Sequence, residues 1–318
     1  MAKAKQKKAK AKQKKDKRVN FYHIEGKEAT IQKIDDKLEE TFLYLQKNQS
    51  KNIDTVELDD NSYYICAMDK AYVDENDSQK FAWLISISRL DTTSPIEIGD
   101  LKKEIEIRNS QLPVKDSQGR VIDTQFLYDS NTHVCAFART SGGLNRALFK
   151  SFLINFCSVP DITFAVILKR DALKKLDELY SWKSFEYKIA EVDNFSGNKD
   201  IDRDELKDIE YASDIGAKVM TMRIVAEKNS SGSVKKLIEK AKILFSNSES
   251  LGIKKLNIDG KNNDGEIEPI DLIQHKLVYK GKIEYDNLIT EKNMFDYLQL
   301  AYHQNYDYFT QLKSDHNN

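Results

Sequence analysis

The sequence predicts an α+β protein of two domains, each a small mixed sheet packed by helices. Segments with the two-residue alternation of strands and segments with helical spacing of apolar residues intermix along the whole chain. At 318 residues, 40% of them hydrophobic, the chain can bury two cores. It contains only four prolines, so no Pro-rich linker is expected between the domains.

The first 18 residues differ from the rest in charge. They hold ten lysines or arginines and one acid, Asp16, so they carry about +9, and the other 300 residues carry about −10. This segment has no apolar stripe with which to dock on a core. We expect residues 1–18 to form a disordered basic tail that binds phosphate without reading base sequence. A solubility tail or a ribosome-associated arm is the alternative.

The N-terminal domain is expected over residues 19–158. A short strand at 19–24 precedes a helix marked by Ile31, Ile34 and Leu38, with Thr30 as its N-cap. Strands are expected at 63–68, 81–88, 125–128 and 133–138, an irregular stretch at 92–120, and a buried helix at 144–156.

The second domain is expected over residues 159–285. Asp171 and Ser233 are candidate N-caps of its helices, and residues 194–204 and 259–265 read as exposed polar turns. Residues 286–318 predict a C-terminal amphipathic helix that packs on the N-terminal domain or on a dimer partner. The expected strands of this domain are 162–168, 185–192, 217–226, 253–258 and 273–279.

One pattern suggests a metal-dependent nuclease. Pro160-Asp161 followed by Glu186-Tyr187-Lys188 fits the loose PD…ExK arrangement, in which two carboxylates hold Mg²⁺ and a lysine supports the attacking water. Glu186 and Lys188 are two apart on a predicted strand, so they would share one face. A chain this rich in Lys and Glu also produces ExK by chance, and a helix separates the two halves where a hairpin is expected. The nuclease is therefore the alternative function.

Other catalytic and metal-binding patterns fail. The run Asn198, Asp200, Asp202 and Asp204 lacks the glycine and the bidentate Glu of a calcium loop. The five histidines are scattered, and no phosphate loop, dinucleotide fingerprint or nucleophile elbow is present. The sequence predicts no metal, no cofactor and no enzymatic activity.

The same evidence bears on location. Cys66, Cys135 and Cys157 lie in apolar stretches, which favours reduced core thiols in the cytoplasm. No run of 18 apolar residues suggests a membrane span, and no apolar region follows the basic N-terminus as a secretory signal would require.

Two glycines join a predicted strand to the helix at 144–156. Gly142 and Gly143 permit a tight turn and the close approach of a phosphate, and the helix N-terminus favours anions. Arg139, Arg146 and Lys150 add fixed positive charge nearby. A plain strand-to-helix connection with surface cations explains the same residues equally well. The sequence does not favour one interpretation over the other.

Two stretches carry a resemblance. The first is Phe126-Leu127-Tyr128, then Ala136 to Thr140 (AFART), then Gly143 and a helix with Phe152-Leu153. The second runs from Ile258 through Gly265-Glu266-Ile267, then Leu277 to Gly281, then a helix with Met294 and Tyr302. In this order the chain resembles the RexA family of phage-exclusion proteins. The basic tail has no counterpart in that pattern.

The resemblance implies a non-enzymatic, homodimeric, cytoplasmic protein that binds DNA without sequence preference. In an abortive-infection system for antiviral defence it would sense phage DNA and activate a small membrane channel of the RexB type encoded nearby. A KwaB-like DNA-binding defence protein is an alternative. The residues expected to bind DNA are Arg139, Arg146, Lys150, Lys235, Lys236, Lys254, Lys255, Lys14, Lys15 and Arg18.

A third interpretation has no nucleic-acid role. The tail is then a solubility device, and the C-terminal helix is an oligomer contact, because tyrosines offer large contact area with a polar tip. The tyrosines in question are Tyr297, Tyr302, Tyr306 and Tyr308.

Overall fold

The computed structural model shows two compact units. It describes residues 13–47, 54–73, 80–94, 96–99, 109–113, 115, 118–190, 192, 207–226, 233–249, 251–261 and 267–316. Unit 1 comprises residues 1–20, 26–162 and 278–318, and unit 2 comprises residues 21–25 and 163–277. Helices and antiparallel sheets occur in both, which confirms the predicted α+β class.

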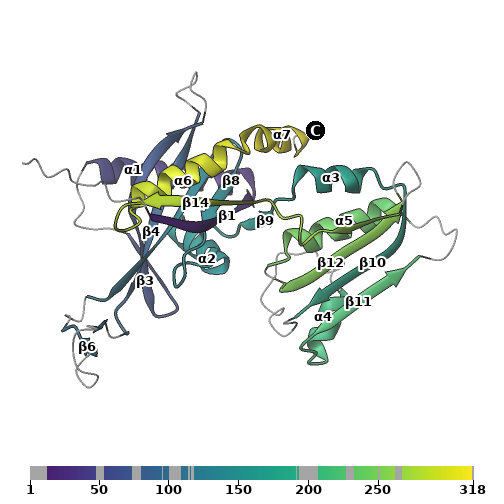
Figure 1. The fold of residues 1–318 in the computed structure, drawn as a ribbon, viewed down its shortest axis with the longest axis horizontal. Helices are drawn as coiled ribbons and strands as arrows, with labels where there is room; N and C mark the ends of the chain where they lie inside the picture. The colour runs from purple at the N-terminus through teal and green to yellow at the C-terminus, as the bar shows by residue number, and fades with distance from the viewer. Residues whose placement is uncertain are drawn as a thin grey trace, which may run out of the picture. The chain divides into compact units, whose positions relative to one another are not determined.

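The main sheet of unit 1 is antiparallel (Figure 1). Its strands in spatial order are β14 (Val278–Tyr285), β1 (Gln13–Glu25), β8 (Val134–Ala138), β7 (Arg120–Asp129), β4 (Phe81–Asp91), β3 (Asn61–Tyr72) and β2 (Thr55–Leu58). A separate pair joins β5 (Glu97–Gly99) to β6 (Asn109–Gln111). The first eight residues of β1 belong to unit 1 and its last five to unit 2.

Helices cover both faces of this sheet. On one face, α1 (Glu28–Gln46) packs Phe42 against Trp83, and α2 (Arg146–Phe156) packs Phe149 against Phe126, with ring centroids 5.2 and 4.4 Å apart. Trp83 and Phe126 share that face by the β4–β7 register. On the other face lies α6 (Glu291–His303), followed by α7 (Tyr306–His316).

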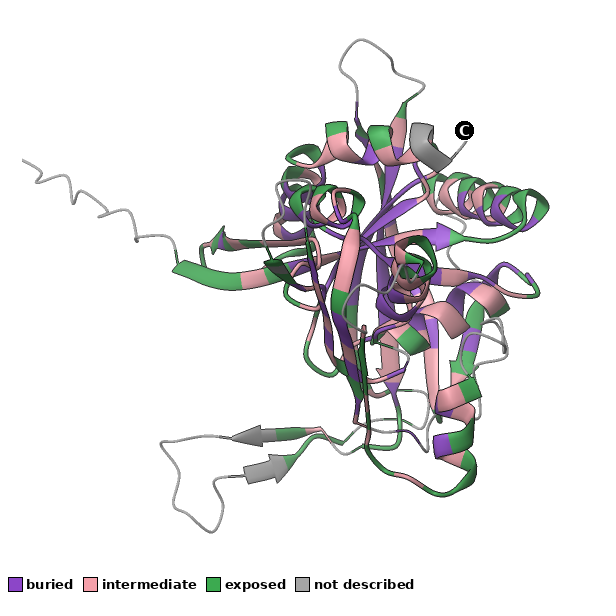
Figure 2. Cartoon of the chain, turned by 90° about the vertical axis from the view of Figure 1, so that its right-hand side faces the viewer, coloured by how far each residue is buried: buried purple, intermediate pink, exposed green. Residues whose placement is uncertain are grey.

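Central strands of unit 1 are buried on both sides as a result. Seven consecutive residues of β4, 82–88, are buried, which is why the sequence there reads as a nearly continuous apolar run. Figure 2 shows buried residues concentrated along these strands.

Unit 2 is built on a four-stranded antiparallel sheet. Its order is β11 (Met220–Val225), β10 (Ser181–Ile189), β12 (Ile253–Lys261) and β13 (Ile267–Asp271). The side chains of Phe185, Tyr187 and Ile189 are buried on the face covered by helices. The remaining elements are β9 (Thr163–Val166), which pairs with the end of β1, and the helices α3 (Arg170–Asp177), α4 (Lys207–Asp214) and α5 (Val234–Ser246).

The prediction that the disordered tail extends through Arg18 is wrong for residues 13–18. These residues form the start of β1, where they pair with residues 280–285 of β14. The partner is more than 260 positions away in the chain, so no local pattern could indicate the strand. Residues 1–12 lie outside the described residues.

Other expectations differ at element ends. The strand predicted at 273–279 is a turn followed by β14, and the single C-terminal helix is two, α6 and α7. Residues 278–285, expected in the second domain, form β14 in unit 1. Ser233 caps α5 as predicted, accepting from the Lys236 amide, whereas α1 and α3 begin after Lys27 and Lys169 instead of Thr30 and Asp171. The polar loop predicted at 194–204 lies outside the described residues.

Candidate nucleic-acid interface

The first half of β1 and β14 form a charged two-stranded ribbon. The strands pair residue by residue from Gln13 opposite Tyr285 to Asn20 opposite Val278. Alternation places every second residue on one face. We define the ribbon face as the six exposed residues Lys14, Asp16, Arg18, Lys280, Lys282 and Glu284.

Cations outnumber acids four to two on the ribbon face. Lys14 Nζ lies 2.6 Å from the Glu284 carboxylate, so this pair is locally neutral. Arg18 lies directly opposite Lys280, and like charges in that position repel. A bound phosphate would relieve this repulsion, which a neutral ligand could not do.

The opposite side of the ribbon packs against α6. Val19 and Ile283 are buried there, and Tyr297 donates a 2.7 Å hydrogen bond to the Lys17 carbonyl. Burial, with a smaller contribution from Lys15, lowers the pKa of Lys17. The helix therefore supports the ribbon from behind, and the predicted site residue Lys15 alternates to this α6 side.

The cations of α2 lie on the same side of the sheet as the ribbon face, because α6 covers the other side. Arg146 is in the first turn of α2, and Lys150 Nζ lies 3.0 Å from the Asp161 carboxylate. Arg139 follows β8, and its carbonyl oxygen is 3.5 Å from the ammonium of Lys17. Unit 1 thus places Lys14, Arg18, Arg146 and Lys150 on one side of its sheet.

The glycine turn before α2 is held by protein groups. The Asn145 side chain accepts from the Leu148 amide at 2.9 Å, and Thr124 Oγ1 accepts from the Leu144 amide at 3.0 Å. The Gly143 amide donates to the Thr140 carbonyl. These three amides already have partners inside the chain, so they offer no donors to a phosphate.

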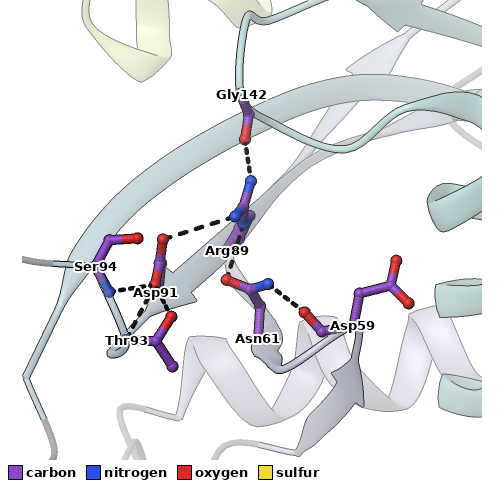
Figure 3. A network of polar contacts seen from close by, with 7 residues as sticks. All are labelled: Asp59, Asn61, Arg89, Asp91, Thr93, Ser94 and Gly142. Atoms are coloured by element: carbon purple, nitrogen blue, oxygen red, sulfur yellow. Dashed lines mark hydrogen bonds and ion pairs between the residues drawn. The ribbon is translucent and has the colours of Figure 1, made fainter.

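Arg89 ties this turn to two strands (Figure 3). Its guanidinium donates to the Gly142 carbonyl at 2.8 Å and to the Asn61 amide oxygen at 3.0 Å, and lies 3.7 Å from Asp91. Hydrogen bonds from Ser94 and Thr93 lower the pKa of Asp91 to about 2. Arg89 is therefore a brace between β3, β4 and the Gly142 turn.

The other predicted cations belong to unit 2. Lys235 and Lys236 are exposed in the first turn of α5, and Lys254 is exposed on β12. Lys255 Nζ lies 2.8 Å from the Glu186 carboxylate. The ten predicted residues are thus divided between the units, six in unit 1 and four in unit 2.

The carboxylates of the nuclease pattern both have cationic neighbours. Asp161 is paired with Lys150 in unit 1, and Glu186, on β10 of unit 2, is paired with Lys255. Glu186 and Lys188 do share one face of β10. Within the described ranges, no three His, Cys, Asp or Glu side chains gather so that they could hold a metal ion.

Lys280 and Lys282 are the site residues that sequence reasoning missed. The sequence feature that could have identified them is a lysine on each side of Gly281, which is informative only once a strand is assigned there.

No family model, curated protein or solved structure matches the chain. Among the described helices, none is long and apolar enough to cross a bilayer.

Proposed function

We propose that the protein binds DNA through phosphate contacts without reading base sequence, and that the ribbon face is the contact surface. The observation that carries the proposal is the cluster of Arg18, Lys280 and Lys282, exposed on a backbone that α6 supports from behind. Lysine and arginine contacts to phosphate add affinity and carry no base information.

A local cluster of cations can bind DNA although the rest of the chain carries a net negative charge. A net charge of about −10 outside the first 18 residues repels a polyanion, so binding requires cations gathered on one surface. The ribbon face is such a surface, with four cations and two acids. Residues 1–12 precede β1 directly and add six lysines to the same end of the sequence.

The resemblance to RexA-like proteins extends this proposal. On that basis the protein is a cytoplasmic DNA sensor of an anti-phage system that signals to a RexB-type membrane channel. DNA binding is the part that the ribbon supports, and it can be tested without a partner.

The test compares the salt dependence of DNA binding by fluorescence anisotropy. Full-length protein should bind two unrelated duplexes with equal affinity. Changing Arg18, Lys280 and Lys282 together to Gln should flatten the slope of log K against log salt by about 2 to 3, since each phosphate contact contributes about 0.9. The matched control changes three exposed lysines of unit 1 outside the ribbon face to Gln: Lys33, Lys47 and Lys292.

Three results would overturn the proposal. Absence of binding at low salt removes DNA binding altogether. A clear preference for one duplex contradicts phosphate-only recognition. Equal flattening by the ribbon triple variant and the control triple variant removes the ribbon face as the contact surface.

A further inference from the structure

The segment from α4 to β11 concentrates exposed apolar side chains. Five large hydrophobic residues within 15 positions are 40–68% exposed, whereas elsewhere in the described ranges such residues occur singly along the sequence. Exposed apolar side chains at an unpaired strand favour association with another chain. The five are Tyr211, Ile215, Val219, Ile224 and Val225.

Three of the five, Val219, Ile224 and Val225, lie in or next to β11, at the outer edge of a sheet. β11 is the terminal strand of the unit 2 sheet and pairs with β10 on one side only, as far as the described strands show. Its backbone extends beyond the strand, since the Val192 amide donates to the Lys218 carbonyl and the Ala226 amide to the Lys183 carbonyl. Exposed edge strands usually carry charges or proline that prevent pairing with another chain. In β11, Arg223 is the only charged residue, and the strand contains no proline.

The strand is complementary to a second copy of itself. Antiparallel pairing about a two-fold axis places residues of the same face opposite one another, so the axis passes through a residue. With the axis at Met222, Val219 lies opposite Val225 of the second copy, Met220 opposite Ile224, and Thr221 opposite Arg223. Apolar residues meet apolar ones, and the two arginines are kept apart.

Neighbouring registers lack this match. An axis at Arg223 sets the two arginines directly opposite each other, which is repulsive. An axis at Thr221 places Arg223 opposite Val219 and Lys218 opposite Ile224. The sequence of β11 therefore selects one symmetric register.

We propose that β11 pairs with β11 of a second copy of the chain in the Met222-centred register, joining two four-stranded sheets into one of eight strands. The backbone edge supplies hydrogen bonds, and the exposed side chains supply apolar area at the seam. This interface lies in unit 2 and does not depend on DNA binding.

Sedimentation velocity over a concentration series tests the proposal. The wild-type chain should show a reversible monomer–dimer equilibrium. Val219→Lys with Val225→Lys places lysines opposite each other at both ends of the seam and should raise the dimer Kd at least about tenfold. Val219→Glu with Val225→Lys places Glu opposite Lys and should restore association.

Matched controls separate the register from general loss of apolar surface. Leu288→Lys and Leu300→Lys change exposed apolar residues of unit 1 and should leave the Kd unchanged. Circular dichroism and melting temperature check that every variant is folded. A wild-type chain that stays monomeric, a double-lysine variant that stays dimeric, or a Glu/Lys variant that stays monomeric would each overturn the proposal.

Discussion

The phenol of Tyr302 on α6 donates a 2.5 Å hydrogen bond to Oδ2 of Asp129 at the end of β7. The single phenol proton is used in this bond, so the Thr132 hydroxyl, 2.8 Å away, must donate to the Tyr302 oxygen. Tyr302 and Asp129 are fully buried and Thr132 almost so. Burial, followed by the nearby Asp129 charge, raises the pKa of Tyr302 well above its ordinary value. The helix α6, which supports the ribbon, is thus anchored to the end of β7 by this buried polar cluster.

Tyr302→Phe should therefore lower the free energy of unfolding by about 1.5 to 3 kcal/mol, because it removes a hydrogen bond to a buried carboxylate while leaving the ring in place. Urea denaturation measures the change. Tyr72→Phe, at a half-exposed tyrosine of the same unit, is the control and should have almost no effect. Equal stability of Tyr302→Phe and wild type would show that the cluster does not anchor α6.

Asp35 on α1 predicts a dependence of stability on pH. Burial raises the pKa of its carboxyl from about 3.8 to about 6, the neighbouring hydroxyls of Ser130 and Tyr128 oppose this rise, and the nearby Asp36 and Asp129 add to it. Because the folded-state pKa is the higher one, ionisation of Asp35 costs stability as pH rises from about 4 through 6. Asp35→Asn should remove that cost.

Thermal unfolding over pH 4 to 8 measures this effect. Asp35→Asn should be more stable than wild type by about 1 to 2 kcal/mol above pH 7, a figure reduced for partial exposure of the carboxyl. The difference should shrink toward pH 4. Glu39→Gln, at an exposed acid of the same helix, should run parallel to wild type at every pH. A constant difference between Asp35→Asn and wild type would contradict the titration.

Gly143 is required for close packing of the turn before α2. A Cβ at this position would lie 2.2 Å from Thr124 Oγ1, the atom that accepts the hydrogen bond of the Leu144 amide. Thr124 is fully buried and cannot move aside without losing that bond. Gly143→Ala should cost about 2 to 4 kcal/mol of stability, since overpacking and a lost buried hydrogen bond combine.

Gly26→Ala is the matched control, because a Cβ there makes only ordinary contacts of 3.5 Å or more. Differential scanning calorimetry of both variants should show a large drop in melting temperature for Gly143→Ala and a small change for Gly26→Ala. Similar melting temperatures would mean that the turn relaxes without cost.

The sequence predicts best where local periodicity and burial agree. The runs that became β3, β4 and α2 are apolar on the faces that pack, and α5 begins where Ser233 offers an N-cap oxygen. It predicts poorly where a distant strand decides the structure. Residues 13–18 are polar or charged and show no local strand pattern. They form a strand through their pairing with β14.

The candidate site shows the same limit. Charge identified Lys14 and Arg18, but their neighbours Lys280 and Lys282 come from the other end of the chain and depend on pairing register. Charge also selected Lys150 and Lys255, and the structure shows each beside a carboxylate, Asp161 and Glu186. A count of cations cannot distinguish a free surface lysine from one that balances a neighbouring acid.

Truncation of the N-terminus separates the basic segment from the strand that follows it. Deleting residues 1–12 removes six lysines and leaves every strand pair of β1 in place, so stability should be unchanged while the salt slope of DNA binding flattens by up to about 5. Deleting residues 1–18 also removes the pairing with residues 280–285 and should lower the free energy of unfolding. Urea denaturation and anisotropy on both truncations measure the two effects. An unchanged salt slope after deletion of residues 1–12 would assign phosphate binding to residues 13–318, and equal stability of the two truncations would contradict the structural role of residues 13–18.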